Sequence, residues 1–349
     1  MRDGLSSAPE FWRLGLMLAL LPGNEQIAAR DRFLQVRQET LDATVAWWDD
    51  VLPDGTSDRH PDLSAVLTQL VMASGDGLFV AAQTERAWNF PRLTDSLARA
   101  FASVAPQLTT APRRRRSARV RDDVNAPQRR EPEESRDRLL AAAAEVATER
   151  GYVGTTISRV CERSGLPVSS LYWFFDDKDA LLAAVVQHSF DEWLDHQPTW
   201  TLATTADMRV TVLKRVLRRT TRSFGDAPDF LRIGHMVALE RQDEDPAARV
   251  LFLRIRRDVE KTLTAWFAGS LSSGPAAGDR ELPRTLARLV IAITDGLFLA
   301  EQMDSWDWDF DALVDALVAV LEEVVAQREA ELGARTRSTS RARRSPART

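Results

Sequence analysis

The most constraining feature of this 349-residue sequence is that one stretch of it occurs twice. Residues 9–37 (PEFWRLGLMLALLPGNEQIAARDRFLQVR) align without a gap with residues 228–256 (PDFLRIGHMVALERQDEDPAARVLFLRIR), at an offset of 219. The same offset places residues 75–83 (GDGLFVAAQ) on residues 294–302 (TDGLFLAEQ). The positions of identity in the first stretch include Pro9, Phe11, Arg13, Gly15, Met17, Ala19, Phe33, Leu34 and Arg37.

The similarity extends further once one residue is inserted. WNFPRLTDSL (88–97) then aligns with WDFDALVDAL (308–317). The repeated unit is about a hundred residues long, whereas the repeats of solenoid proteins have periods of roughly 20 to 50 residues. The sequence therefore predicts one domain present twice.

The apolar pattern predicts an all-α fold. Leucines and valines recur at the spacing of three and four residues that places them on one helix face, as in Leu63, Val66, Leu67 and Leu70. The aligned stretch repeats the pattern with Leu286, Leu289, Val290 and Ile293. Alternation of β-branched residues is nearly absent, and Pro and Gly cluster in the intervening loops.

Composition restricts the class of protein and the cellular compartment. The chain is 44% hydrophobic and 28% charged, which is typical of a globular protein, and its length favours more than one domain. The single cysteine, Cys161, excludes an intrachain disulfide and indicates a reducing compartment. No run of 18 apolar residues is present, so we expect no membrane span and a cytoplasmic protein.

The charges are unevenly distributed, although the net charge is only −5. Residues 108–134 carry eight Arg against five acidic residues, and residues 333–349 carry six Arg and no acidic residue. Both segments hold too few apolar residues to order themselves, so we expect a disordered Arg-rich linker and a disordered basic tail. Either segment would attract a polyanion.

Residues 135–180 precede the second member of the repeat and have no counterpart before the first. Gly151 is expected to end a first helix, and Thr155 or Thr156 to cap a second that ends at Gly165. Pro167 suits the start of a short third helix over residues 168–174. Asp176 and Asp177 would cap a fourth helix. Two short helices joined by a tight glycine-containing turn indicate a helix-turn-helix.

The third helix has the composition of a recognition helix. Leu171 and Phe175 are expected in the core. This leaves the side chains of Ser169, Ser170, Tyr172 and Trp173 on the outside. Hydroxyls at the start of such a helix bond to base edges or phosphates, and Lys178 would meet a phosphate near a helix N-terminus. The candidate DNA-contacting residues are Thr155, Thr156, Pro167, Val168, Ser169, Ser170, Tyr172, Trp173 and Lys178.

This segment resembles the TetR family of transcriptional regulators. The matching positions are Gly151 or Gly154, Thr155, Thr156, Cys161, Ser164, Gly165, Leu171, Tyr172, Phe174, Phe175, Lys178, Leu181 and Leu182. The resemblance implies a helical ligand-binding and dimerisation domain at 181–332, with 1–107 as a partial second such domain that lacks a helix-turn-helix. The family usually has Ser or Thr where Pro167 stands, and often Gly where Ser169 stands. These departures affect which side chains would touch bases.

The resemblance also implies dimerisation through the last two helices, expected here at Glu281–Met303 and Phe310–Leu332, with residues 62–86 and 90–107 as their repeated equivalents. Three arrangements stay open. In the first, the two halves pair within one chain, which then has a single helix-turn-helix. In the second, two chains pair with each other, and the dimer has two helix-turn-helix units. Alternatively, the gene begins upstream and a first helix-turn-helix has been lost.

We therefore predict a DNA-binding regulator of the bacterial cytoplasm and nucleoid, an effector-responsive repressor by family resemblance. The partners would be double-stranded DNA and a small-molecule effector. The alternative is an interaction module that modulates a related regulator and has little DNA affinity of its own. His235 is a candidate residue of the ligand pocket, although a lone histidine on an apolar helix is more often structural. No spacing of catalytic, metal-ligating or cofactor-binding residues predicts an enzyme, a metal or a cofactor.

Overall fold

The computed structural model describes residues 9–21, 28–54, 56, 60, 62–108, 131–226, 228–240, 245–303 and 309–344. All regular secondary structure in these residues is helical, so the predicted all-α class is confirmed. The first helices are α2 (Pro9–Ala19), α3 (Ala28–Val51), α5 (Leu63–Thr84) and α6 (Phe90–Val104), with a 3-10 turn at Ala105–Gln107. We call these four helices the N-terminal set.

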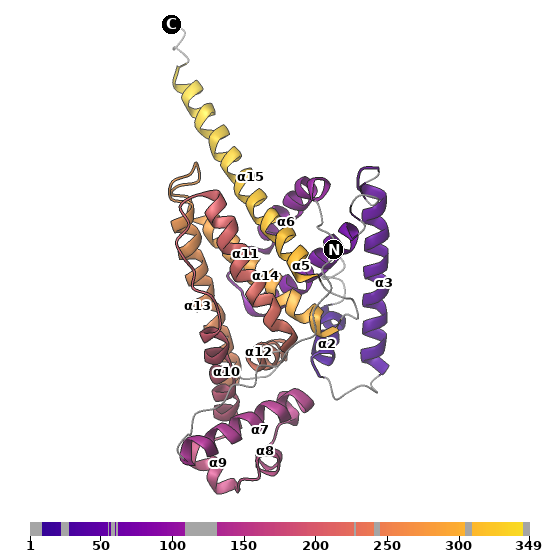
Figure 1. Ribbon diagram of the computed structural model, residues 1–349, viewed down its shortest axis with the longest axis vertical. Coiled ribbons are helices and arrows are strands. Elements are labelled where there is room, and N and C mark those ends of the chain that lie inside the picture. Colours follow the sequence, from indigo (N-terminus) through magenta and orange to yellow (C-terminus); the bar gives the residue numbers. More distant parts are fainter. Residues whose placement is uncertain are drawn as a thin grey trace.

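The helix-turn-helix region follows, with α7 (Glu131–Gly154), α8 (Ile157–Ser164), α9 (Val168–Phe174) and α10 (Lys178–Asp195). Helix α11 (Ala206–Ser223) and a 3-10 turn at Phe224–Asp226 come next. The chain continues through α12 (Asp229–Leu239), α13 (Ala247–Ser270), α14 (Glu281–Met303) and α15 (Phe310–Arg344), which we call the C-terminal set. Figure 1 shows α7, α8 and α9 at one end of the molecule and the end of α15 projecting at the other.

The centre of the molecule is the packing of α5 along α14 (Figure 1). Two glycines permit it, because a Cβ on Gly77 would overlap the carbonyl oxygen of Ala292 and a Cβ on Gly296 would overlap that of Ala73. Helix α5 is long and apolar enough to cross a membrane by composition alone, but 78% of its most apolar window is buried inside the protein. It is a core helix here, and α3 and α15 also pack on it.

Each set holds one buried ion pair. Arg37 Nη1 lies 2.7 Å from Asp76 Oδ2 between α3 and α5. Arg256 pairs with Asp295 between α13 and α14. The four side chains are at most 8% exposed, so each charge depends on its partner for compensation.

Two predicted boundaries differ from the structure. Helix α7 begins at Glu131, inside the segment expected to be linker, and residues 109–130 lie outside the described part. Helix α15 runs to Arg344, whereas residues 333–349 were expected to be disordered. The anchored part of α15 provides the helical nucleus, so the residues after it extend the helix without a new nucleation step.

Candidate nucleic-acid interface and ligand cavity

The helix-turn-helix is built by capping residues that the sequence makes recognisable. Gly151 has φ 71°, which kinks the end of α7, and Gly165 has φ 68° at the end of α8. Thr156 caps α8 by accepting from Arg159 N, and Asp177 caps α10 by accepting from Ala180 N at 2.7 Å. The predicted third helix, Val168–Phe174, has the bounds observed for α9.

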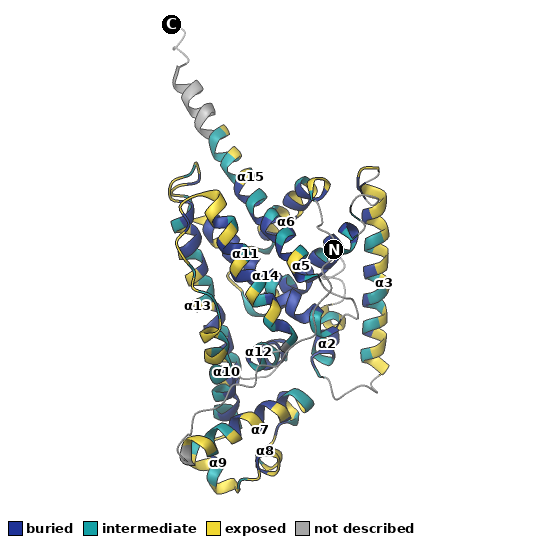
Figure 2. Cartoon of the chain, viewed as in Figure 1, coloured by how far each residue is buried: buried dark blue, intermediate teal, exposed yellow. Residues whose placement is uncertain are grey.

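Helix α9 separates core residues from exposed ones as expected. Leu171 and Phe175 are buried against α7 and α8. Tyr172 and Trp173 are 54% and 82% exposed, and Val168 is 44% exposed. Ser169 and Pro167 are exposed and Ser170 is half-buried. One short helix therefore presents hydroxyl and aromatic groups to solvent. This helix lies at the end of the molecule (Figure 2).

The structure corrects the role expected of Thr155. Its side chain is 1% exposed and its hydroxyl donates to Gly151 O at 2.7 Å, so it closes the α7–α8 turn from inside. Thr156, next in the chain, is exposed and caps α8. The alternation of two neighbouring threonines between core and solvent follows from the turn, which the sequence alone left undecided.

Lys178 is also engaged within the protein. Its Nζ donates to Tyr152 O at 3.2 Å and lies 3.9 Å from the centre of the Tyr152 ring. The Tyr152 hydroxyl donates to Asp179, and burial together with this carboxylate raises the pKa of Tyr152. These contacts join the end of α7 to the start of α10, so Lys178 holds the region together as well as offering a charge.

The sequence analysis missed Arg159. It is exposed on α8, and its Nη1 donates to Gly154 O beside the N-terminus of that helix. The other exposed arginine of α8, Arg163, is paired with Glu145 and Glu149 at 2.8 Å. Arg159 lies three residues after the Thr156 cap, in the first turn of α8, a position that the predicted helix start already indicates.

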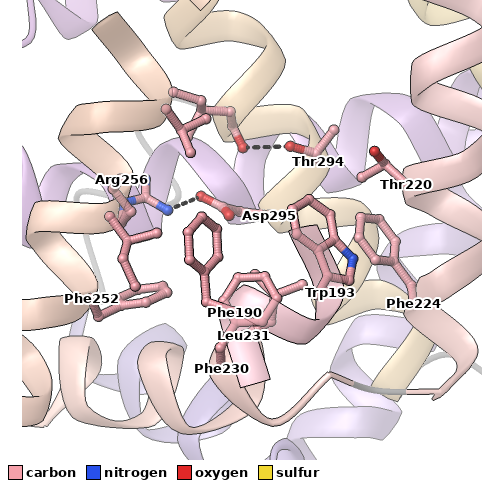
Figure 3. Close-up of a pocket in the computed structure, with 13 residues that line it drawn as sticks. Phe190, Trp193, Thr220, Phe224, Phe230, Leu231, Phe252, Arg256, Thr294 and Asp295 are labelled. Atoms are coloured by element: carbon pink, nitrogen blue, oxygen red, sulfur yellow. Dashed lines mark hydrogen bonds and ion pairs between the residues drawn. The ribbon is translucent and has the colours of Figure 1, made fainter. Parts of the chain in front are cut away.

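Behind the helix-turn-helix lies a cavity of about 90 Å³ with an almost wholly apolar lining (Figure 3). It is lined by residues of α10, α11, α12, α13 and α14 and of the 3-10 turn at Phe224–Asp226. Aromatic rings supply much of its wall, namely those of Phe190, Trp193, Phe224, Phe230 and Phe252. The charged residues that line it are Arg256 and Asp295.

His235 is not among the residues that line this cavity. It is fully buried between the rings of Phe252 and Phe298, with Nε2 3.4 Å from Asp295 Oδ1. Burial raises the pKa of Asp295, but Arg256 and His235 more than offset this and hold it below the ordinary value. His235 therefore supports the ion pair from the side remote from the cavity. Among the described residues no cluster of His, Cys, Asp or Glu is arranged to hold a metal ion.

The cavity connects to the helix-turn-helix through two helices. Helix α10 begins at Lys178 beside Tyr152 and carries Phe190 and Trp193 into the wall. Helix α12 carries Phe230 and Leu231 into the wall, and both helices pack on α7. The same two helices therefore form part of the cavity wall and support α7.

Comparison with known proteins decides the class. Residues 139–185 match the family described as bacterial regulatory proteins, tetR family. The chain therefore contains a tetR-family DNA-binding region and is a DNA-binding transcriptional regulator. The match runs from the middle of α7 to the first turns of α10, which is the region whose caps and exposed face are described above.

Similar proteins place this TetR-family region in context. A curated relative, the HTH-type transcriptional regulator BetI of Paraburkholderia phytofirmans, is 24% identical over 194 residues, which are 56% of this chain and 95% of the relative. A solved TetR-like regulator from Rhodococcus sp. RHA1 is 18% identical over 55% of this chain and 96% of its own, with a TM-score of 0.41. The fatty acid degradation regulator FadR from Bacillus halodurans is 16% identical over 56% of this chain and 96% of its own, with a TM-score of 0.42. Little more than half of the chain corresponds to nearly the whole BetI relative, so this regulator carries an additional helical region.

Proposed function

We propose that this regulator is an effector-responsive repressor in which α9 enters the major groove. The observation that carries the proposal is the exposed face of α9, where Ser169, Tyr172 and Trp173 lie on the outside of a capped helix-turn-helix. Thr156, Val168 and Ser170 border that face, and Arg159 supplies a phosphate-binding charge from α8. Lys178 contributes by positioning α10 against α7, and the Arg-rich segment 113–130 adds sequence-independent attraction to DNA.

The test is a footprint of the purified protein on the DNA that flanks its own gene. Tyr172→Ala with Arg159→Ala is the loss variant, and Asp95→Asn, an exposed change on α6, is the matched control. We expect protection that the double variant loses and the control keeps. Protection that the double variant leaves unchanged would contradict the role of α9.

Deleting residues 113–130 tests the linker separately. Removing six or more phosphate-binding charges should lower the affinity for DNA and flatten its dependence on salt concentration. An unchanged salt slope would show that the linker is only a spacer.

The same proposal includes an effector bound in the cavity. The cavity lies between α10 and α12, and both helices hold α7. A ligand that separates the two helices would reorient α9 and favour the arrangement that does not fit DNA. The proposed cellular location, the cytoplasm and nucleoid, follows from the DNA partner.

We further infer that the N-terminal set is a partial duplicate of the C-terminal set and takes the place of a dimer partner. Helices α3 and α13 have bounds related by the sequence offset of 219, and so do the two buried ion pairs. The contacts of Gly77 with Ala292 and of Gly296 with Ala73 also exchange under that offset. Such reciprocal contacts are typical of an isologous, two-fold interface.

In this arrangement the DNA-binding unit is a single chain with one helix-turn-helix. Two measurements together test this arrangement, namely the footprint on DNA and the molecular mass from light scattering. We expect a monomer that protects one half-site. A stable dimer that protects two half-sites about one helical turn apart would support pairing between chains instead. A protein that binds no DNA yet forms a complex with a related regulator would support the interaction-module alternative.

A further inference from the structure

Arg256, which lines the cavity, carries a buried hydrogen-bond donor that no described residue uses. Arg256 is 6% exposed, uses Nη1 for Asp295 and places Nε 3.4 Å from Glu85 Oε1. Its Nη2 is buried and has no hydrogen-bond partner among the described residues. A buried donor without a partner costs free energy, so a ligand atom that accepts from Nη2 would gain by satisfying it.

The other polar groups of the wall are already satisfied as donors. Thr294 donates to Val290 O at 2.8 Å and Thr220 donates to Gln197 at 3.3 Å. Trp193 Nε1 donates to Ser223 Oγ at 2.9 Å. Arg256 Nη2 is therefore the donor that remains for a ligand among the residues that line the cavity.

The charge of Arg256 is already compensated. Burial lowers its pKa, but the carboxylates of Asp295 and Glu85 raise it above the ordinary value, so the guanidinium stays charged. The side chains of Asp295 and Glu85 are 8% and 11% exposed. A ligand carboxylate would be a third negative charge in this poorly solvated place, which is unfavourable, whereas a carbonyl or hydroxyl adds no charge.

We propose that the cavity takes an uncharged, mainly apolar molecule, aromatic or aliphatic, with one hydrogen-bond acceptor that binds Arg256 Nη2, and that Glu85 excludes anionic analogues. This rests on the proposed effector response and specifies the ligand class. Aromatic walls and one converging polar group match such a molecule. An engineered cavity of about 150 Å³ holds benzene, so a ring-sized ligand displaces some of the wall here and moves α10 and α12.

Glu85 gives the inference its second part. It is the C-cap residue of α5, in the N-terminal set, and it contacts Arg256 without being one of the residues that line the cavity. The N-terminal set thus contributes a specificity-determining carboxylate to the ligand site of the C-terminal set. A regulator without this additional region would lack that carboxylate.

The experiment measures binding of benzamide, benzoate and toluene to the purified full-length chain at one fixed pH. The three probes share one ring and differ in charge and acceptor, and Trp193 in the wall provides a fluorescence signal alongside calorimetry. In the wild type we expect benzamide to bind about tenfold more tightly than benzoate. The reason is that the carboxylates of Asp295 and Glu85 repel the negative charge of benzoate. Toluene, which has no acceptor, should also bind more weakly than benzamide.

Two variants sharpen the test. Glu85→Gln should reduce the preference for benzamide over benzoate about tenfold, whereas Glu39→Gln, an exposed change of equal charge on α3, should leave it unchanged. Arg256→Lys keeps the charge but removes Nη2, and should remove the advantage of benzamide over toluene.

Benzoate binding as tightly as benzamide, an unchanged preference in Glu85→Gln, or binding of none of the probes would overturn the proposal. The footprint without any probe tests DNA binding by itself. Failure of the ligand class is therefore distinguishable from failure of the proposed repressor.

Discussion

The N-terminal and C-terminal sets carry similar residues at aligned positions, yet bury them differently. Phe11 is 39% exposed in α2, whereas Phe230, at the aligned position in α12, is 4% exposed. Trp47 and Trp266 show the same contrast, with 53% and 7% exposed. Figure 2 shows the long exposed face of α3 on the side of the N-terminal set.

This difference in burial arises from the helices that pack over each set. Phe190 and Trp193 of α10 cover Phe230, and Trp200 packs on Trp266, whose Nε1 donates to Thr201 O. In the described part of the chain, no helix equivalent to α10 or α11 precedes the N-terminal set. The comparison teaches that an aromatic residue in a repeated helix is buried only where the chain supplies a second layer over it.

The interface shared by the two sets should be the most sensitive to substitution. Gly77→Val would drive a side chain into the backbone of α14 at Ala292, which cannot move aside as a side chain can. We expect a loss of more than about 4 kcal/mol of unfolding free energy, measured by urea denaturation. Gly269→Ala, whose new Cβ would lie 3.1 Å from a flexible Leu202 methyl group, is the control and should change it little.

The aligned phenylalanines should differ in their contribution to stability. Phe230→Ala leaves a void beside the cavity and should cost about 3 to 5 kcal/mol. Phe11→Ala removes a ring that is already partly in water, so we expect roughly 1 kcal/mol, with both values from urea denaturation. Equal losses would mean that the face of α2 is covered in solution.

The two ion pairs should behave alike, with losses of about 3 kcal/mol of unfolding free energy for Asp76→Asn and for Asp295→Asn, since each substitution removes a carboxylate paired with a buried arginine. The pKa of Asp295 is held below the ordinary value of aspartate. The stability it contributes is therefore present above about pH 4 and is lost as the pH falls below that range. A pH series of unfolding should accordingly show a smaller acid loss in Asp295→Asn than in the wild type, and parallel curves would contradict this role.

Local signals in the sequence were sufficient for the helix-turn-helix. Gly151, Gly165 and Asp177 act at helix ends through backbone conformation and single hydrogen bonds, so their roles depend on residues close by. The bounds of α9 follow from Pro167 and the apolar spacing of Leu171 and Phe175. The all-α class follows from periodicity over whole helices, which averages out errors at single residues.

Side-chain roles within that region needed the structure. Thr155 and Thr156 are chemically equivalent in the sequence, and the turn decides that one is buried and the other exposed. Lys178 was expected to face only DNA, but the Tyr152 ring at the end of α7 holds it. Arg159 and Arg163 could be distinguished only in the structure, where Arg163 is paired with two glutamates.

The sequence by itself determined the all-α class and the helix-turn-helix, because each depends on residues near one another or on a pattern over a whole segment. Only the tertiary structure decided that Arg256 meets Glu85 and that α10 covers Phe230 but not Phe11. These contacts join residues 40 to 171 positions apart. Their existence depends on how helices pack, and a side chain carries no local mark of which helix will cover it.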